Sequence, residues 1–152
     1  MTRPTIEEET PTPASSGLAE VQLGEEITFT KTLGETDVYL FAGLTGDMHR
    51  NHIDEEYMKS TPYGGRIVQG ALLVGLTAAC SSILCTRLAG PVVSYGYDRI
   101  RFVRGVRLGD TVTVRYRVAR KDEAEAKVFA DITCVNQHGE TVAVATHILK
   151  FL

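Results

Sequence analysis

An uncharged segment of about 20 residues, 67–86, constrains the fold of this chain more than any other feature; it reads IVQGALLVGLTAACSSILCT. Its length matches that of a membrane-spanning helix. Its hydrophobicity is nevertheless diluted by four polar side chains, namely Gln69, Thr77, Ser81 and Ser82. We therefore expect a helix that is buried on most sides within a soluble domain, and no membrane as a partner. Gly90 and Pro91 should end this helix, because glycine suits a helix cap and proline cannot continue one.

Alternation of apolar and polar residues predicts strands before and after this helix. One strand is expected ahead of it, at Glu26–Thr32, and four are expected behind it, at 92–103, 111–118, Lys127–Val135 and 141–149. The clearest of these, 111–118, places four apolar side chains on one face: Val112, Val114, Tyr116 and Val118. Short turns between successive strands, such as NQHG at 136–139, imply an antiparallel sheet.

Two shorter helical segments are expected between the first strand and the long helix. The hydroxyl of Thr36 can cap a helix, and apolar residues recur after it at helical spacing. This helix should stop near Gly46, since glycine tolerates the left-handed conformation of a helix end. A helical turn is expected over 54–59, and we interpret Asp54 as the structural start of that turn.

The order of these elements predicts an α+β fold class. A continuous apolar helix needs a sheet curved around it to cover its surface. An antiparallel β-sheet wrapped around one long central α-helix is the hotdog fold. The chain has 152 residues, and we expect a single domain over residues 18–152. Residues 1–17, which contain three successive glutamates and three prolines, are expected to be a disordered N-terminal leader that lacks the order of a signal peptide.

Composition argues against several classes of protein. A net charge of −3 and a pI near 5.8 give no general reason to expect nucleic acid as a partner. Cys80, Cys85 and Cys134 form no CxxC pair, and we interpret them as reduced thiols in a cytoplasmic protein. We interpret a run of four arginines as a solvated strand edge, with contact to phosphates of coenzyme A or of a carrier as the alternative: Arg99, Arg101, Arg104 and Arg107.

The first motif with a chemical meaning is TGDMHRNHID, at 45–54. It brings a carboxylate, Asp47, and an imidazole, His52, into one loop. Such a pair can hold a water molecule, with one group accepting a proton from water while the other supplies a proton to carbon. An imidazole is well suited to this exchange near neutral pH. We therefore predict that Asp47 and His52 form an acid–base dyad.

The second motif, YGGRIVQGA at 63–71, places Gly70 at the entrance to the long helix. Helix N-termini present unpaired amides and positive partial charge. Gly70 would let a ligand oxygen approach its N–H closely. A thioester carbonyl placed there would gain negative charge as an enolate forms, and stabilising that charge is the oxyanion-hole effect. Acid–base groups beside such a hole suit proton transfer next to a thioester.

Together the two motifs resemble those of the MaoC-like dehydratases, which include the (R)-specific enoyl-CoA hydratases. The pattern of that family is roughly F-x-x-x-[TS]-G-D-x-N-P-x-H-x-D followed by F-G-x-x-I-x-H-G-M-L. This chain reads FAGLTGDMHRNHID at 41–54 and YGGRIVQGALL at 63–73. The resemblance implies that Asp47 and His52 are the catalytic dyad and that the Gly70 amide faces the thioester oxygen.

The resemblance further implies a hydro-lyase that adds water to an enoyl thioester, or removes it from a 3-hydroxyacyl thioester. Its substrate would be an acyl-CoA or an acyl-carrier-protein thioester, and no separate cofactor is expected. Proteins of this fold usually dimerise and bind ligand near the subunit interface, so a homodimer or a larger dimer-based assembly is expected.

Three departures from the family pattern, one of them a pair of adjacent residues, are expected to affect substrate binding. His49-Arg50 replaces the usual Asn-Pro, which frees the backbone of the loop and adds a titratable group beside the dyad. Gln69 replaces the usual histidine before the glycine, and Ala71 replaces the usual methionine after it. The smaller Ala71 would widen the acyl pocket.

Two other functions stay open at this point: a thioesterase of the same fold, and a non-catalytic acyl-CoA-binding subunit, which the departures motivate. A metal site built from Asp47, His49 and His52 is disfavoured, because the spacing matches no zinc motif. His138 and His147 are interpreted as structural.

Overall fold

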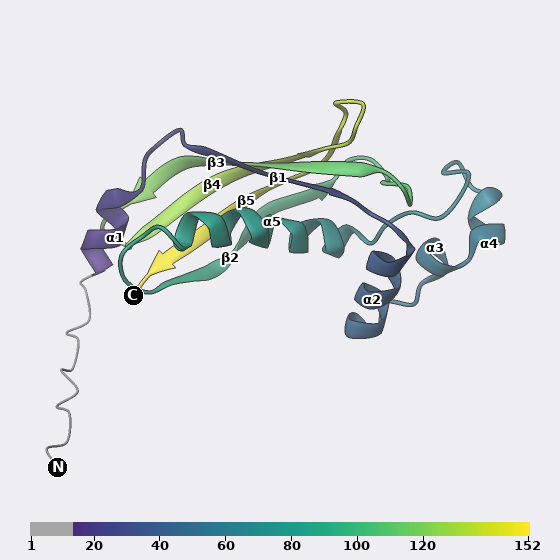
Figure 1. The fold of residues 1–152 in the computed structure, drawn as a ribbon, viewed down its shortest axis with the longest axis horizontal. Coiled ribbons are helices and arrows are strands. Elements are labelled where there is room, and N and C mark those ends of the chain that lie inside the picture. The colour runs from purple at the N-terminus through teal and green to yellow at the C-terminus, as the bar shows by residue number, and fades with distance from the viewer. Residues whose placement is uncertain (1–13) are drawn as a thin grey trace, which may run out of the picture.

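The computed structural model describes residues 14–152, and its main feature is a five-stranded sheet laid over one long helix (Figure 1). Three short helices gather near one end of the long helix, and another short helix lies near its other end (Figure 1). In chain order the elements are α1 (Ala14–Glu20), β1 (Glu26–Thr32), α2 (Glu35–Thr45), α3 (Arg50–Ile53), α4 (Glu55–Lys59), α5 (Gly70–Cys85), β2 (Val92–Phe102), β3 (Thr111–Asp122), β4 (Lys127–Val135) and β5 (Thr141–Phe151).

The strands pair antiparallel throughout, in the order β1-β3-β4-β5-β2. The three strands that follow one another through short turns, β3, β4 and β5, form the centre of the sheet, and β1 and β2 form its edges. Helix α5 packs across the inner face of this curved sheet (Figure 1). This is the hotdog arrangement, so the predicted α+β fold and all five predicted strands are confirmed.

The core lies between α5 and the inner face of the sheet. The four apolar residues predicted to share one face of β3 are all buried: Val112, Val114, Tyr116 and Val118. From α5, four side chains on the facing surface of the helix are buried with them, Leu73, Leu76, Cys80 and Leu84. Burying an aliphatic side chain of this size stabilises a fold by about 1.5–3 kcal/mol, so this contact accounts for the position of the helix.

Helix α5 is shorter than the uncharged segment that predicts it. It begins at Gly70 because the residues before it are extended and pair with the loop after β2: the Val68 N–H donates to the Val106 carbonyl at 2.8 Å. It ends at Cys85, ahead of the predicted stop at Gly90 and Pro91. Within residues 14–152, no helix has the length and apolarity needed to cross a membrane.

The short helices differ in part from the prediction. Thr36 does not cap α2, because the N-cap is Gly34, whose N–H donates to the carboxylate of Asp37 at 2.9 Å. The end of α2 is as predicted: Gly46 adopts the left-handed conformation, with φ of 79°. Asp54 caps α4 by accepting from the Tyr57 N–H at 2.9 Å, whereas α3 was not predicted.

Helix α1 begins at Ala14, ahead of the predicted domain start at residue 18, and residues 1–13 of the predicted leader lie outside the described residues. Helix α1 packs at the end of the sheet away from α2, α3 and α4 (Figure 1). Leu18 is buried there, and the carboxylate of Glu20 accepts from the Ala89 N–H at 2.9 Å.

The cysteines behave as the composition suggests. All three are free thiols, and Cys80 and Cys134 are buried. Burial raises the pKa of Cys80 and of Cys134 to about 11, which keeps both thiols protonated and unreactive near neutral pH.

His147 is the centre of a polar cluster within the core, consistent with a structural role. Its Nδ1 lies 2.9 Å from the Tyr116 hydroxyl, and its Nε2 lies 2.7 Å from the Ser94 hydroxyl. A neutral imidazole has one donor and one acceptor nitrogen, so it can satisfy both hydroxyls. The ring also stacks on Tyr97 at 4.3 Å between centroids. Burial lowers the pKa of His147 to about 4, because the charged ring would lose its hydration.

We predict that this histidine makes the fold sensitive to acid. Below its ordinary pKa of 6.5, His147 binds a proton in the unfolded chain, whereas in the folded chain it stays neutral down to about pH 4. The free energy of unfolding should therefore keep its full value above pH 6.5 and decrease as the pH falls from 6.5 to about 4. The contribution of His147 to the slope of unfolding free energy should be about 1.4 kcal/mol per pH unit within that window. Urea unfolding of wild type and His147→Gln at several pH values measures it. The exposed His138→Gln variant is the control, and an unchanged slope in His147→Gln would contradict the prediction.

Candidate active site

The turn that ends α2 and the short helix α3 position the predicted dyad. The left-handed Gly46 reverses the chain, and Asp47 follows it with its N–H 3.3 Å from the Thr45 hydroxyl. His52 lies on α3, one turn after the N-cap His49. The side chain of His52 is 11% exposed, whereas the side chain of Asp47 is 40% exposed. The site therefore combines a buried imidazole with a carboxylate that solvent and ligand can reach.

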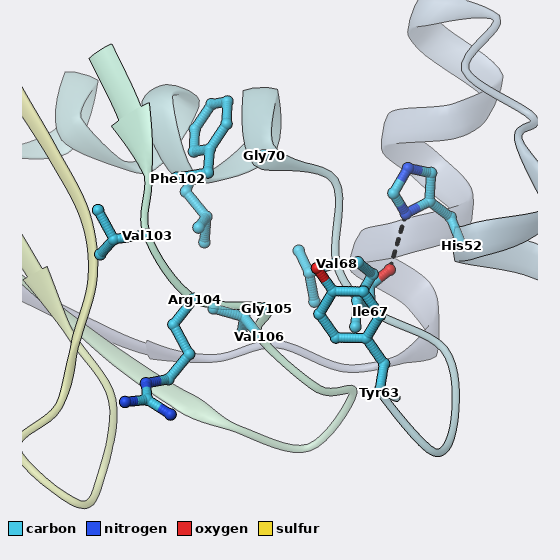
Figure 2. Close-up of a pocket in the computed structure, with 11 residues that line it drawn as sticks. His52, Tyr63, Ile67, Val68, Gly70, Phe102, Val103, Arg104, Gly105 and Val106 are labelled. Carbon is cyan, nitrogen blue, oxygen red and sulfur yellow. Dashed lines mark hydrogen bonds between the residues drawn. The ribbon is translucent and has the colours of Figure 1, made fainter. Parts of the chain in front are cut away.

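A backbone carbonyl determines which ring nitrogen of neutral His52 carries the hydrogen. Nδ1 of His52 lies 2.7 Å from the carbonyl oxygen of Ile67, and Figure 2 shows this bond as a dashed line. A carbonyl oxygen can only accept, so Nδ1 must carry the hydrogen. In the neutral ring, Nε2 is then the free base, and it is the nitrogen that faces Asp47.

The Asp47 carboxylate and the His52 ring approach each other without forming a direct hydrogen bond. Oδ2 of Asp47 lies 3.7 Å from Nε2 of His52. This separation exceeds the usual hydrogen-bond length but allows an ion pair with a protonated ring, or a water molecule that contacts both groups. The structure thus places the two predicted groups together.

A pocket joins His52 to the start of α5. It has a volume of about 210 Å³, and Figure 2 shows its lining: His52, Tyr63, Ile67, Val68, Gly70, Leu73, Phe102, Val103, Arg104, Gly105 and Val106. The lining is mainly apolar, and its polar side chains are those of His52, Tyr63 and Arg104. An apolar pocket with a few convergent polar groups is typical of a small-molecule site.

Residue 70 must be a glycine for a steric reason that the sequence alone did not predict. A Cβ atom at residue 70 would come within 2.6 Å of the Phe102 ring, far inside van der Waals contact. The glycine therefore admits an aromatic side chain from β2 against the first turn of α5. This steric requirement holds alongside the predicted approach of a ligand oxygen to the Gly70 amide.

The remaining residues predicted to bind substrate lie around the pocket but are not part of its lining. His49 is exposed, and its Nδ1 accepts from the Asn51 N–H at 3.3 Å. Gln69 is fully buried, its Nε2 donates to the Val38 carbonyl at 3.2 Å, and its Oε1 has no partner among the described residues. Ala71 is exposed on α5. Their roles in substrate binding stay predictions.

Arg66 is a positioning residue that sequence reasoning missed, although it lies within the second motif. Its guanidinium pairs with Glu35 on α2 and, at 3.3 Å, with Glu55 on α4, while its own side chain is largely buried. The hydrogen bond with Glu35 raises the pKa of Arg66 and lowers that of Glu35. Arg66 thus fastens the segment before α5 to the two helices that flank the dyad.

Two of the four arginines in the predicted basic run lie at the site. Arg104 lines the pocket and lies 3.4 Å from Glu140, and Arg107 donates to the carbonyls of Tyr63 and Gly64. Arg107 therefore stabilises the loop that forms one wall of the pocket. In residues 14–152, no group of three or more histidine, cysteine, aspartate or glutamate side chains is arranged to hold a metal ion.

Comparison with known proteins identifies the family. A model of the MaoC like domain matches residues 18–138. The chain belongs to the MaoC-like family. The (R)-specific enoyl-CoA hydratase of Rhodospirillum rubrum is 38% identical over 99 residues, which are 65% of this chain and 67% of that protein. The 3-hydroxybutyryl-CoA dehydratase of Methylorubrum extorquens is 33% identical over 115 residues, which are 76% and 71% of the two chains. The resemblance inferred from the two motifs is confirmed.

Solved structures agree with this MaoC-like assignment. The unliganded R-hydratase PhaJ1 of Pseudomonas aeruginosa is 30% identical with a TM-score of 0.76, over 90% of this chain and 85% of that one. The (R)-hydratase of A. caviae, described as involved in PHA biosynthesis, has a TM-score of 0.79 at 22% identity, over 88% and 98% of the chains, which shows the shared fold.

We predict that Gly70 and Phe102 are energetically coupled. Gly70→Ala should destabilise the protein by about 1 kcal/mol, because the ring must move away from the added methyl group. In a Phe102→Ala background the same change should be neutral or stabilising, since alanine favours a helix by about 1 kcal/mol over glycine.

A double-mutant cycle of urea unfolding measures this coupling. Gly75→Ala is the matched control, because it lies on the same helix and a Cβ there meets nothing within 4 Å. That control should stabilise the protein equally in both backgrounds. Equal effects of Gly70→Ala with and without the Phe102 ring would rule out the coupling.

Proposed function

We propose that this MaoC-like protein is an enoyl-thioester hydratase that also catalyses the reverse dehydration of a 3-hydroxyacyl thioester, with acyl-CoA as its substrate. The observation that carries the proposal is the placement of Asp47 Oδ2 3.7 Å from His52 Nε2, with His52 and Gly70 on one pocket. The relatives named enoyl-CoA hydratase and 3-hydroxybutyryl-CoA dehydratase support this choice of reaction.

In the hydration direction, the proposed mechanism adds a hydroxyl group to Cβ and a proton to Cα of the enoyl thioester. The Asp47 carboxylate accepts a proton from water while the water oxygen bonds to Cβ of the enoyl thioester. The π electrons move to Cα, which takes a proton from Nε2 of the protonated His52. The proton on Asp47 then passes to Nε2 of His52 through a water molecule that contacts both groups, since 3.7 Å is too long for direct transfer, and this restores the pair. The sum is the addition of one water molecule, with hydroxyl on Cβ and hydrogen on Cα.

The start of α5 supplies the electrostatic part of this mechanism. As electrons move towards the thioester, its carbonyl oxygen gains negative charge. Gly70 is the first residue of α5, where amides lack acceptors within the helix and the helix dipole is positive. Donation from the Gly70 N–H to that oxygen would stabilise the transition state, and losing one such donor costs about 3–4 kcal/mol in acyl-transfer enzymes.

The proposal includes a homodimer, for which the exposed edge strand β2 is the support. This strand ends the sheet, so one side of its backbone has no strand partner among the described residues. It also carries two exposed apolar side chains in its first half, Val93 and Tyr95. An unpaired apolar edge favours association with a second chain.

We predict that Asp47→Asn and His52→Gln each lower kcat for hydration of crotonyl-CoA by about 100-fold or more, because each removes one partner of the proton transfer. Loss of enoyl absorbance measures the reaction. Asp131→Asn, an exposed carboxylate on β4 outside the pocket, is the control and should retain wild-type activity.

A parallel assay of thiol release separates this reaction from thioester hydrolysis. A hydratase consumes the enoyl group without releasing thiol. Release of coenzyme A at the rate of substrate loss would replace the hydratase proposal with a thioesterase. Full activity of Asp47→Asn would remove that residue from the mechanism.

A further inference from the structure

A second, smaller hollow lies beside the site pocket, between α5 and the sheet. Ten residues line it: Leu73, Val74, Thr77, Ile100, Phe102, Ile132, Cys134, Ala143, Val144 and Ala145. Two of them, Leu73 and Phe102, also line the site pocket. The two spaces are therefore neighbours that share a wall.

The hollow is apolar and very small. Its volume is about 10 Å³, roughly the space that one water molecule needs, compared with about 210 Å³ for the site pocket. Ala143 and Ala145 on β5 leave this space because their side chains are small. At Thr77, whose hydroxyl is 2.8 Å from that of Tyr97, the lining becomes polar. An acyl chain could lengthen into the hollow only if a wall moved.

Phe102 is the wall that can move. It is the last residue of β2 and stands opposite Ala143 in the β2–β5 register, so it projects from the same face of the sheet as the hollow. Its ring packs against the first turn of α5 at Gly70 (Figure 2). The residue is nevertheless 51% exposed, so a change of rotamer would displace little core packing.

We propose that Phe102 determines the acyl length that this site accepts, by closing the passage from the site pocket to the apolar hollow. This proposal rests on the proposed function, because it assigns the site pocket to the thioester and its first acyl carbons. With the ring against Gly70, the site holds a short acyl group. Without the ring, the hollow and the space of the missing side chain form a continuous apolar path along α5 towards Thr77.

The path also explains which groups it would reject. Every lining side chain between Phe102 and Thr77 on β4 and β5 is apolar or a thiol, and burial keeps Cys134 uncharged by raising its pKa to about 11. A charged group at the end of an acyl chain would lose its hydration there without gaining a partner. The longer substrates admitted by removing the ring therefore carry uncharged hydrocarbon chains.

The first test measures binding, independently of turnover. Calorimetry compares butyryl-CoA with octanoyl-CoA, which carry no enoyl group, on the full chain of wild type, Phe102→Ala and Phe102→Leu. The ratio of Kd for butyryl-CoA to Kd for octanoyl-CoA should rise by about tenfold or more in Phe102→Ala, and by less in Phe102→Leu. Leu23→Ala is the control, an exposed large apolar residue that lies outside β2 and lines neither space, and it should leave the ratio unchanged.

The second test repeats the comparison with crotonyl-CoA and octenoyl-CoA, using kcat/KM for hydration. The same shift in the ratio would extend the role of Phe102 to catalysis. Wild-type protein that binds acyl-CoA but hydrates neither substrate would refute the proposed function, while the Kd ratios would still decide the role of Phe102. Equal Kd ratios in wild type and Phe102→Ala would overturn the role of Phe102, whatever the activity.

Discussion

The hydrogen bond between Nδ1 of His52 and the carbonyl oxygen of Ile67 joins the two parts of the candidate site. It attaches α3 to the extended segment that leads into α5, and the same bond leaves Nε2 free to face Asp47. That segment is itself fixed to the loop between β2 and β3, since Ile67 pairs with Arg107 and the Val68 N–H donates to Val106. A short series of hydrogen bonds therefore sets the position of His52 relative to α5.

The buried helix sets the second constraint. Because α5 is covered by the sheet over one surface, its first turn has a fixed place at the end where α2, α3 and α4 gather (Figure 1). Arg66, which precedes α5, holds α2 and α4 close to this turn through its ion pairs with Glu35 and Glu55. An imidazole and a helix N-terminus thus meet at one pocket, and the Asp47 carboxylate lies beside the imidazole. This arrangement fits the chemistry of thioester hydration in a MaoC-like protein.

The sequence predicted the fold well, because the determining signals are local and repeated. Alternation identified every strand, and the uncharged segment identified α5. Prediction was weaker where a single distant contact decides the outcome. Pairing of Val68 with the loop after β2 delays the start of α5, and Asp37 makes Gly34 the cap in place of Thr36. The motifs likewise predicted Asp47, His52 and Gly70 as site residues, and the structure places Asp47 near His52 and puts His52 and Gly70 on one pocket. Phe102 lies 32 positions beyond Gly70, and the sequence carries no local signal of their contact.

The attachment of the short helices limits the motion of this end of the molecule. Helix α2 contributes Val38 to the hydrophobic core, and Met58 of α4 is also buried. Polar links add to this packing, namely the guanidinium of Arg66, the His52 bond and the buried amide of Gln69. Opening of the region would expose apolar surface as well as break hydrogen bonds, so it would cost more free energy than the fraying of a surface loop.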